Sequence, residues 1–138
     1  MIIVAATDDR GAIAFNHRRV SSDRALTAWL VSLAQESRLW MNEYSSRLFE
    51  GADVSQPHIS VDPDFPERAA PGEFCLFETT PPDRWLDRAE RVIAARWNRR
   101  YPGDLFLTLP PDEWKLTKRR EFPGYSHEKI TIEEYTRA

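Results

Sequence analysis

Polar side chains that could bind an anion gather in the segment 7–23, directly after the first apolar run of the chain. Two adjacent arginines, Arg18 and Arg19, lie here together with Asn16 and Asp23. Guanidinium groups bind phosphates and carboxylates through paired hydrogen bonds, and the free amides of a helix start strengthen such a site. We therefore predict a small anionic ligand at this segment. In the alternative interpretation the arginines are solvated or pair with nearby carboxylates, namely Asp8, Asp9 and Asp23.

Two other segments carry hydrogen-bonding groups that could join this site. Asn42, Tyr44 and Ser45 follow a short apolar run, where they would either contact a ligand or cap a helix. His127 stands beside Glu128, and a histidine next to a carboxylate is sufficient for acid–base chemistry if it faces a cleft. A surface or purely structural histidine is the alternative.

The sequence offers little for metal or nucleotide chemistry. None of the three histidines is followed by another histidine or a cysteine two to four residues further on, and the one cysteine of the chain cannot complete a zinc site, so we expect no metal site. Glycine-rich phosphate-binding loops and the common hydrolase motifs are absent, and no cofactor is assigned. The single Cys75 lies in the apolar run Phe74–Phe77, which predicts a buried thiol in a reducing compartment.

Length and composition indicate one ordinary globular domain over residues 1–138. Hydrophobic residues make up 41% and charged residues 30% of the chain, and the formal charge of −3 gives no overall preference for nucleic acid or anionic lipid. Apolar runs are far shorter than the roughly 20 residues of a membrane span. The start, Met1–Ala6, lacks a basic region and reads as a first strand rather than a signal peptide. We therefore expect a cytoplasmic protein without membrane contact.

The longest periodic stretch predicts a helix over 83–100 followed by a buried strand, Leu105–Thr108. The apolar stripe of this helix would consist of Trp85, Ala89, Val92, Ile93 and Trp97. Its last turn mixes arginines with aromatic residues, a pattern that can also bind single-stranded nucleic acid. We favour the interpretation that Trp97 is buried and that the arginines complement the helix dipole.

The remaining pattern alternates strands with helices. Strands are predicted at 2–7, 39–41, 58–61, 74–77 and 114–118, with 12–15 extending or returning from the first turn. A helix should begin at Ser21 or Ser22, with Asp23 in its first turn, and end near Glu36. We expect short helices at 42–49 and 65–70, a loop at 51–57, and either a helix or an edge strand at 130–135.

This order predicts an α/β fold, a three-layer sandwich with a mainly parallel sheet and an antiparallel C-terminal edge. Ligands of such sheets bind beyond the carboxyl ends of the strands, which places 7–23, 42–46 and the segment after Val61 at the candidate site. An extended conformation of 83–100 would contradict the arrangement, because the sheet would lose a helix that covers it.

Five short segments follow one another in a recognisable order: Met1–Ala5, the turn Gly11–Ile13, Ser22–Leu26 at the start of the first helix, Leu39–Asn42 and Asp104–Thr108. Their order resembles that of the dihydrofolate reductase family. The resemblance implies a sheet of that architecture. It also implies that Asp23 is the acidic residue that holds a pterin, and that Ser45 occupies the position that follows the second strand.

Three departures from the family pattern argue against NADPH binding and reduction. Arg19-Val20 stands where the family has Pro-Trp, and Ala94-Ala95 stands where a Gly-Gly pair lets the cofactor pyrophosphate approach. Glu43 stands where a cation for the cofactor phosphate is expected. The resemblance therefore implies the architecture and not the activity.

Three other segments, Phe15–Asp23, Trp97–Pro102 and Ser126–Thr131, carry a second resemblance. They resemble segments of small bacterial proteins of mobile genetic elements, to which a ribonuclease label is loosely applied. The metal-dependent ribonuclease that the label suggests requires a histidine cluster that this sequence lacks.

Our first hypothesis is thus a bacterial accessory protein that binds a small anionic ligand or a protein partner. The second is an enzyme, either a divergent NADPH-dependent reductase or a metal-independent ribonuclease or phosphodiesterase using His127 or His17.

Overall fold

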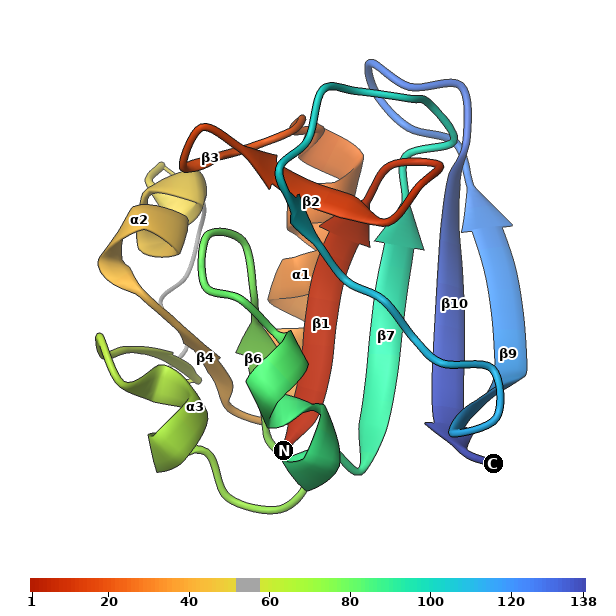
Figure 1. Cartoon of the computed structure of the whole chain (residues 1–138). Helices are drawn as coiled ribbons and strands as arrows, with labels where there is room; N and C mark the ends of the chain where they lie inside the picture. The colour runs from red at the N-terminus through yellow and green to blue at the C-terminus, as the bar shows by residue number, and fades with distance from the viewer. Residues whose placement is uncertain (52–57) are drawn as a thin grey trace.

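The central feature of the structure is a seven-stranded sheet with the order β5-β4-β6-β1-β7-β10-β9 (Figure 1). The computed structural model describes residues 1–51 and 58–138, so most of the predicted loop 51–57 lies outside the described residues. In chain order the strands are β1 (Ile2–Thr7), β4 (Leu39–Met41), β5 (Ile59–Val61), β6 (Phe74–Leu76), β7 (Arg91–Arg96), β9 (Trp114–Phe122) and β10 (Ile130–Arg137).

The five strands from β5 to β7 are parallel, and β10 and β9 continue the sheet in antiparallel pairs. The predicted fold class, a mainly parallel sheet with an antiparallel C-terminal edge, is therefore confirmed. β1 lies at its centre because both of its faces are apolar: Ile2 and Val4 pack on one side, Ile3 and Ala5 on the other. Cys75 is fully buried in β6, and burial raises the pKa of its thiol to about 12.

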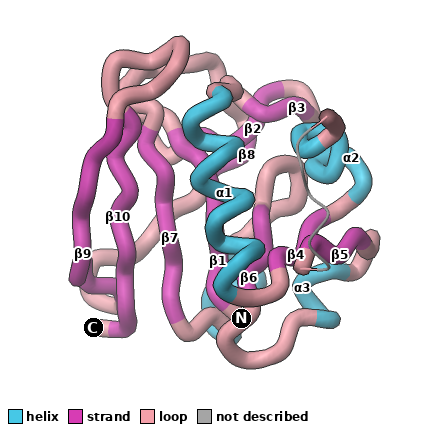
Figure 2. The backbone as a smooth tube through the Cα atoms, turned by 180° about the vertical axis from the view of Figure 1, so that it is seen from behind, coloured by secondary structure: helices cyan, strands magenta, loops and turns pink. Residues whose placement is uncertain are grey.

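One face of the sheet is covered by α1 (Arg24–Glu36), which buries Leu26, Leu30 and Leu33 (Figure 2). The N-cap of this helix is Asp23, whose side chain accepts a hydrogen bond from the Ala25 amide. Our assignment of the cap to Ser21 or Ser22 was wrong by one or two positions. The predicted short helix at 42–49 is present as α2 (Glu43–Ser46) and the 3₁₀ helix η1 (Arg47–Phe49).

The opposite face is covered by a second, three-stranded sheet and two short helices, which form the third layer (Figure 1). The small sheet has the order β3-β2-β8, and this layer consists of β2 (Ala12–Phe15), β3 (Arg18–Arg19), β8 (Leu105–Phe106), α3 (Phe65–Arg68) and the 3₁₀ helix η2 (Asp83–Arg88). The predicted strand 105–108 is thus shorter than expected and belongs to this second sheet. Gly11 permits the turn from β1 to β2, since its φ is +91° and a Cβ would lie 2.6 Å from the Leu107 carbonyl oxygen.

The predicted helix over 83–100 was wrong. Its first part is the 3₁₀ helix η2, and its second part is β7, which pairs with β1 and with β10. Val92–Ala95 are all buried, as in a parallel strand covered on both faces, and Trp85 and Ala89 belong to a separate turn that mimicked the helical period. The sheet nevertheless forms, because the segment joins it as a strand and the third layer comes from other elements.

The C-terminal segment resolves the alternative left open by the sequence. Residues 130–137 form β10, which lies inside the sheet between β7 and β9. The edge strand is β9, longer than predicted and exposed along most of its length. Among the described residues no helix is long and apolar enough to cross a bilayer.

Candidate functional site

The carboxyl ends of β1 and β7 point to one edge of the sheet, where three connections and the β2-β3 hairpin meet (Figure 1). The connections are the turn after β1, the segment 97–104 after β7 and the loop 123–129 between β9 and β10. This edge holds Asp23 and His127, which are 104 residues apart in sequence and form a buried pair. This edge therefore joins the polar segment 7–23 to the His127 segment, two of the candidates named from the sequence.

The Asp23 carboxylate is completely surrounded by donors of its own chain. Oδ1 accepts from the amides of Ala25 (2.8 Å) and Tyr125 (2.9 Å). Oδ2 accepts from the Ser126 amide (2.9 Å) and hydroxyl (3.1 Å) and from the His127 amide (3.1 Å), and it lies 2.9 Å from His127 Nδ1. A carboxylate offers about four lone-pair positions, so these donors leave none for a ligand.

Charge is retained on Asp23 although its side chain is fully buried. Burial alone would raise its pKa, but the hydrogen bonds from the Tyr125 amide, the His127 ring, and the Ser126 and Ala25 amides outweigh this effect. The pKa of Asp23 therefore lies well below its ordinary value of 3.8. The carboxylate ties the loop 123–129 to the start of α1.

The other ring nitrogen of His127 contacts two hydroxyl groups. Nε2 lies 3.1 Å from Ser21 Oγ and 2.9 Å from the Tyr101 hydroxyl oxygen. The ring also stacks on Trp97, with centroids 4.6 Å apart at an interplanar angle of 28°. The carboxylate that orients His127 is Asp23, and not the sequence neighbour Glu128, which is exposed. This arrangement of hydroxyl, imidazole and carboxylate can transfer a proton.

Close packing at Gly124 and the hydrogen bonds of Asp8 position the segments that surround the Asp23–His127 pair. A Cβ at Gly124 would lie 2.4 Å from the His127 carbonyl oxygen and 2.9 Å from Asp23 Oδ2, so only glycine fits there. Asp8, buried in the turn after β1, accepts from the amides of Arg10, Ala12 and Tyr101, and so positions the segment that carries the Tyr101 hydroxyl.

Asn16 and Arg18, predicted as ligand contacts, lie in the hairpin formed by β2 and β3. Asn16 and His17 form the two-residue turn between β2 and β3, and both have positive φ values of 52° and 63°. Asn16 donates its amide to Asp104, and its side chain is exposed. Arg18 is also exposed at this edge.

Arg19 does not pair with any of the aspartates proposed from the sequence. Its guanidinium makes a two-point contact with Glu78, at 2.8 and 3.0 Å, and lies over the Tyr44 ring at 4.5 Å. Burial lowers and the Glu78 hydrogen bond raises the pKa of Arg19, with a net increase. The Tyr44 hydroxyl accepts from the Arg19 amide (3.0 Å), so this cluster fastens the hairpin to α2 and to the end of β6.

Asn42 and Ser45 form the N-terminal cap of α2. The Asn42 side chain accepts from the Ser45 amide as N-cap and donates to the Thr79 hydroxyl at 3.2 Å. The Ser45 side chain is buried, and among the described residues its hydroxyl has no hydrogen-bond partner. The structure thus brings Arg19, Tyr44 and Asn42 to one cluster and Asp23 and His127 to another.

The space between these two clusters is small. A cavity of about 10 Å³ lies between α1 and the sheet, lined by Ser21, Leu26, Glu78 and Trp97 among others. A volume of that size holds about one water molecule. Within the described part of the chain, this position therefore has no room for a pterin-sized ring.

No protein-family model and no curated protein matches the chain. Among solved structures it is similar to the dihydrofolate reductase of Enterococcus faecalis complexed with NADP(H) and RAB-propyl, with a TM-score of 0.65 over 99% of this chain and 95% of that one. The fold is that of dihydrofolate reductase. The sequences are 12% identical, so the dihydrofolate reductase fold is shared without any inference about activity.

The residues matched to the dihydrofolate reductase motifs lie in β7, in α2 and at the start of α1. Ala94 and Ala95 lie inside β7 and are buried in the sheet, and not within a helix as we predicted. Glu43 is exposed in the first turn of α2. Asp23 is saturated by its own chain, as described above.

Sequence reasoning missed Glu78, Tyr101 and Ser21 as members of the site. Glu78 directly follows an apolar run, and a carboxylate at the carboxyl end of a buried strand was a usable signal. Tyr101 carried no such signal, because its position depends on the turn after β7 and on Asp8. Ser21 was considered only as a helix cap.

Proposed function

We propose that this chain is a cytoplasmic bacterial accessory protein with the dihydrofolate reductase fold, which binds a small anionic ligand or the anionic group of a partner and does not reduce pterins. The observation that carries this proposal is the state of Asp23. Its carboxylate is occupied by internal hydrogen bonds, and the cavity between α1 and the sheet, lined by Ser21 and Trp97, has room for about one water molecule. Asp23 itself lines a separate, open hollow of about 750 Å³ together with Arg24 and Tyr125. A pterin would have to displace donors that the fold itself uses.

Cations around the same edge support an anionic ligand. Four exposed arginines lie there: Arg18 on the hairpin, Arg24 at the start of α1, and Arg99 and Arg100 after β7. Within the described residues none of them lies within 4.0 Å of a carboxylate. Arg24 lies over the Tyr125 ring at 5.0 Å, and Arg99 donates to the Ser126 carbonyl oxygen at 3.3 Å, so two of them are held beside the Asp23 loop. Ordered guanidinium groups are suited to phosphate or carboxylate.

A binding panel tests this proposal. The folding stability of the chain should rise with one of four probes: NADPH, nucleoside phosphates, folate or a short RNA. A ligand at about 100 times its Kd adds about 2.7 kcal/mol. In the double variant Arg24→Gln/Arg99→Gln the affinity should fall by about 10-fold, because two charged contacts are lost. The control Arg84→Gln/Arg88→Gln, on η2 at the other end of β7, should bind as before.

Two results would contradict the proposal. If no probe at millimolar concentration raises the folding stability, the proposal that the chain binds a small anionic ligand is wrong. If the protein catalyses the oxidation of NADPH by dihydrofolate, the proposal that it is an accessory protein without reductase activity is wrong. The first result tests anion binding by the arginines, and the second tests the absence of reductase activity that we infer from Asp23. Each part of the proposal can therefore fail without the other.

A second function, metal-independent phosphodiester hydrolysis, has one observation in its favour. His127 is oriented by Asp23 through Nδ1, and its Nε2 lies within hydrogen-bond reach of Ser21 and Tyr101, which is the geometry of a general base beside a hydroxyl. The side chain of His127 is only 3% exposed, so a substrate would need the loop 123–129 to open.

If this second function is correct, short RNA should be cleaved in the presence of EDTA. Cleavage should fall by at least ~100-fold in His127→Gln, since general acid–base groups contribute ~100-fold or more. The variant His17→Gln, in the exposed hairpin turn, should cleave normally. Absence of cleavage by the unmodified protein, or equal cleavage by both variants, would reject this function.

A further inference from the structure

Two exposed aromatic side chains lie at the sheet edge that holds Asp23. Among the described residues, Phe15 (49% exposed) and Tyr125 (73% exposed) are the only aromatic residues in the exposed class. Phe15 is the last residue of β2, in the hairpin, and Tyr125 lies in the loop 123–129. An accessible ring at each end of this edge offers a surface on which a planar group can stack.

Each of these rings has an arginine beside it. Arg24 lies over the Tyr125 ring at 5.0 Å. Arg18 is directly opposite Phe15 in the pairing of β2 with β3, and residues in that relation are neighbours on one face of a sheet. Within the described residues neither arginine lies within 4.0 Å of a carboxylate. Both ends of the edge therefore combine a stacking surface with an available guanidinium group.

The segment 97–104 connects the two ends. Its first part contacts the loop that carries Tyr125, because Arg99 donates to a carbonyl oxygen of that loop at 3.3 Å. Its last part contacts the hairpin, because the Asp104 amide donates to a carbonyl oxygen of β2 at 2.9 Å. Figure 1 shows this segment crossing the edge from the end of β7 toward the hairpin. The exposed Arg99 and Arg100 thus lie between the two ring–arginine pairs.

The fold removes the explanation that we favoured for these two arginines from the sequence. We expected Arg99 and Arg100 in the last turn of a helix, where cations complement the dipole. They follow the strand β7 instead, which ends at Arg96, so no helix dipole is available to them. Trp97 is buried as expected. The alternative interpretation of this segment, contact with a single-stranded nucleic acid, therefore regains its basis.

The open hollow of about 750 Å³ beside Tyr125 has room for a base. Val31 and Leu48 line it and are half-buried, so part of their apolar surface is accessible. Glu50 lines it as well, and a carboxylate accepts hydrogen bonds from the amino groups of bases but repels phosphate. The hollow therefore suits a base, whereas phosphates would lie with the arginines.

We propose that this edge binds a single-stranded nucleic acid, with bases stacked on Tyr125 and Phe15 and phosphates at the four exposed arginines. The inference rests on the anion binding proposed above and names the class of its ligand. Proteins hold single strands by this combination of aromatic stacking and phosphate contacts. A duplex keeps its bases paired and stacked on one another, so it would not use the two rings.

An anionic membrane surface fits this edge less well. Tyr125 lies beside the start of α1, which covers one face of the main sheet, whereas Phe15 belongs to the layer on the opposite face. A flexible strand can bend over the edge and reach both rings, but a flat bilayer would reach one side. Three exposed carboxylates on the same connections, Asp9, Asp104 and Glu128, moderate the positive charge, so we expect micromolar rather than nanomolar affinity.

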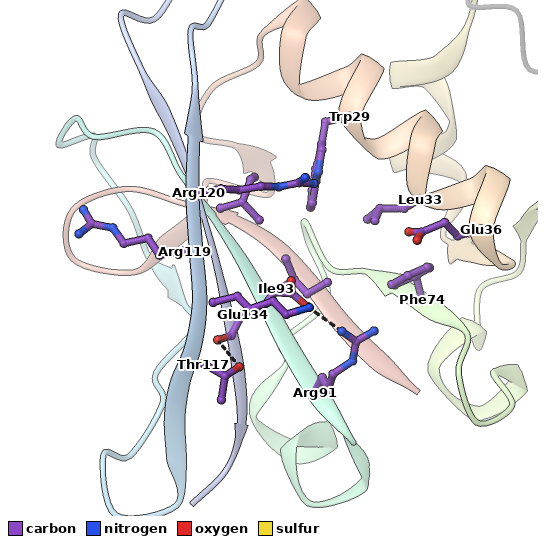
Figure 3. A pocket seen from close by; sticks show the side chains of 12 residues that line it. Trp29, Leu33, Glu36, Phe74, Arg91, Ile93, Thr117, Arg119, Arg120 and Glu134 are labelled. Atoms are coloured by element: carbon purple, nitrogen blue, oxygen red, sulfur yellow. Dashed lines mark hydrogen bonds and ion pairs between the residues drawn. The ribbon is translucent and has the colours of Figure 1, made fainter.

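A second group of cations, on β9, provides a control. Lys118 and Arg120 line a groove of about 620 Å³ between α1 and β9, together with the acids Glu36 and Glu134 (Figure 3). Within the described residues this groove has no exposed aromatic ring. Cations without rings are thus available at a second place on the same molecule.

The test measures the fluorescence anisotropy of a labelled oligouridylate of 12 nucleotides. Binding should be saturable, and the logarithm of the association constant should fall with that of the salt concentration with a slope of about −3, since each of four phosphate contacts contributes about −0.7. Arg100→Gln should make this slope less steep by about 0.7. The affinity of a duplex of the same length should be lower.

Tyr125 separates stacking from charge. Tyr125→Ala should weaken binding by about 10-fold without changing the salt slope, and Tyr125→Phe, which keeps the ring, should restore most of the affinity. The hydrogen bond from this residue to Asp23 is made by its amide, so the alanine variant keeps it, and an unchanged urea midpoint checks the fold. The control Lys115→Gln/Lys118→Gln should change the affinity by less than about 2-fold, because Lys118 is about 14 Å from the end of β9, beyond a Debye length of about 8 Å.

Any of three results would overturn the nucleic-acid assignment. The first is binding of uridine monophosphate as tight as that of the 12-mer, which would leave the proposed anion site intact. The second is full affinity in Tyr125→Ala. The third is tighter binding to vesicles of equal parts phosphatidylglycerol and phosphatidylcholine, with the same dependence on Arg100. If the 12-mer, uridine monophosphate and inorganic phosphate all fail to bind, the proposed function is wrong as well.

Discussion

Replacing Asp23 with alanine should lower the free energy of unfolding by about 3–5 kcal/mol, the range for removing one partner of a buried charged network. The variant loses the N-cap of α1 and the acceptor of three consecutive amides, those of Tyr125, Ser126 and His127. Each buried amide left without an acceptor costs about 1–3 kcal/mol, and a lost cap costs about 1 kcal/mol. Urea denaturation at neutral pH measures the change.

The neighbouring carboxylate Asp9 provides the control for this prediction. It is exposed in the turn after β1, so Asp9→Ala should change stability by less than about 0.5 kcal/mol. A loss of under about 1 kcal/mol in Asp23→Ala would show that the loop 123–129 is not held by this carboxylate.

The same network predicts how stability depends on pH. The pKa of Asp23 in the folded chain lies below its ordinary value, so the carboxylate contributes stability that is fully present above about pH 4 and is lost as the pH falls through the folded pKa. Asp23→Asn lacks this titration. The stability difference between the unmodified protein and Asp23→Asn should therefore shrink below about pH 4, and a constant difference from pH 7 to pH 3 would contradict the assignment.

Replacing Trp97 with alanine should cost about 3–5 kcal/mol, as for other large buried aromatic residues. Trp97 follows β7, is 2% exposed, and packs between the core on the α1 face and the His127 ring. Its removal would leave a cavity beside the Asp23–His127 pair. Chemical denaturation measures the loss directly.

The conservative variant Trp97→Phe sharpens this second prediction. Within the described residues the indole Nε1 is buried without a hydrogen-bond partner, so phenylalanine removes no hydrogen bond. We expect a cost below about 1.5 kcal/mol, because the ring still packs on His127. If Trp97→Phe were as destabilising as Trp97→Ala, the indole N–H would have a role that the packing does not explain.

The sequence by itself determined those parts of the fold that depend on local pattern. The continuous apolar run Ile2–Thr7 predicted a central strand, and the helical spacing of Leu26, Leu30 and Leu33 predicted α1. The alternation of such segments was sufficient for the fold class and for the resemblance to dihydrofolate reductase that the structure bears out. The single-domain assignment and the bacterial, mobile-element context stay predictions.

Tertiary structure decided what local pattern could not. The segment 83–100 has apolar residues at helical spacing, but its second half pairs with both β1 and β10 as β7. As a strand inside the sheet it buries Ile93 and Ala95 on one face and Val92 and Ala94 on the other, whereas an amphipathic helix buries a single stripe. Likewise, Asp23 meets His127 over 104 residues, and Arg19 meets Glu78 over 59. Periodicity reports only on neighbours within a few residues, whereas these contacts exist because separate strands end at the same edge of one sheet.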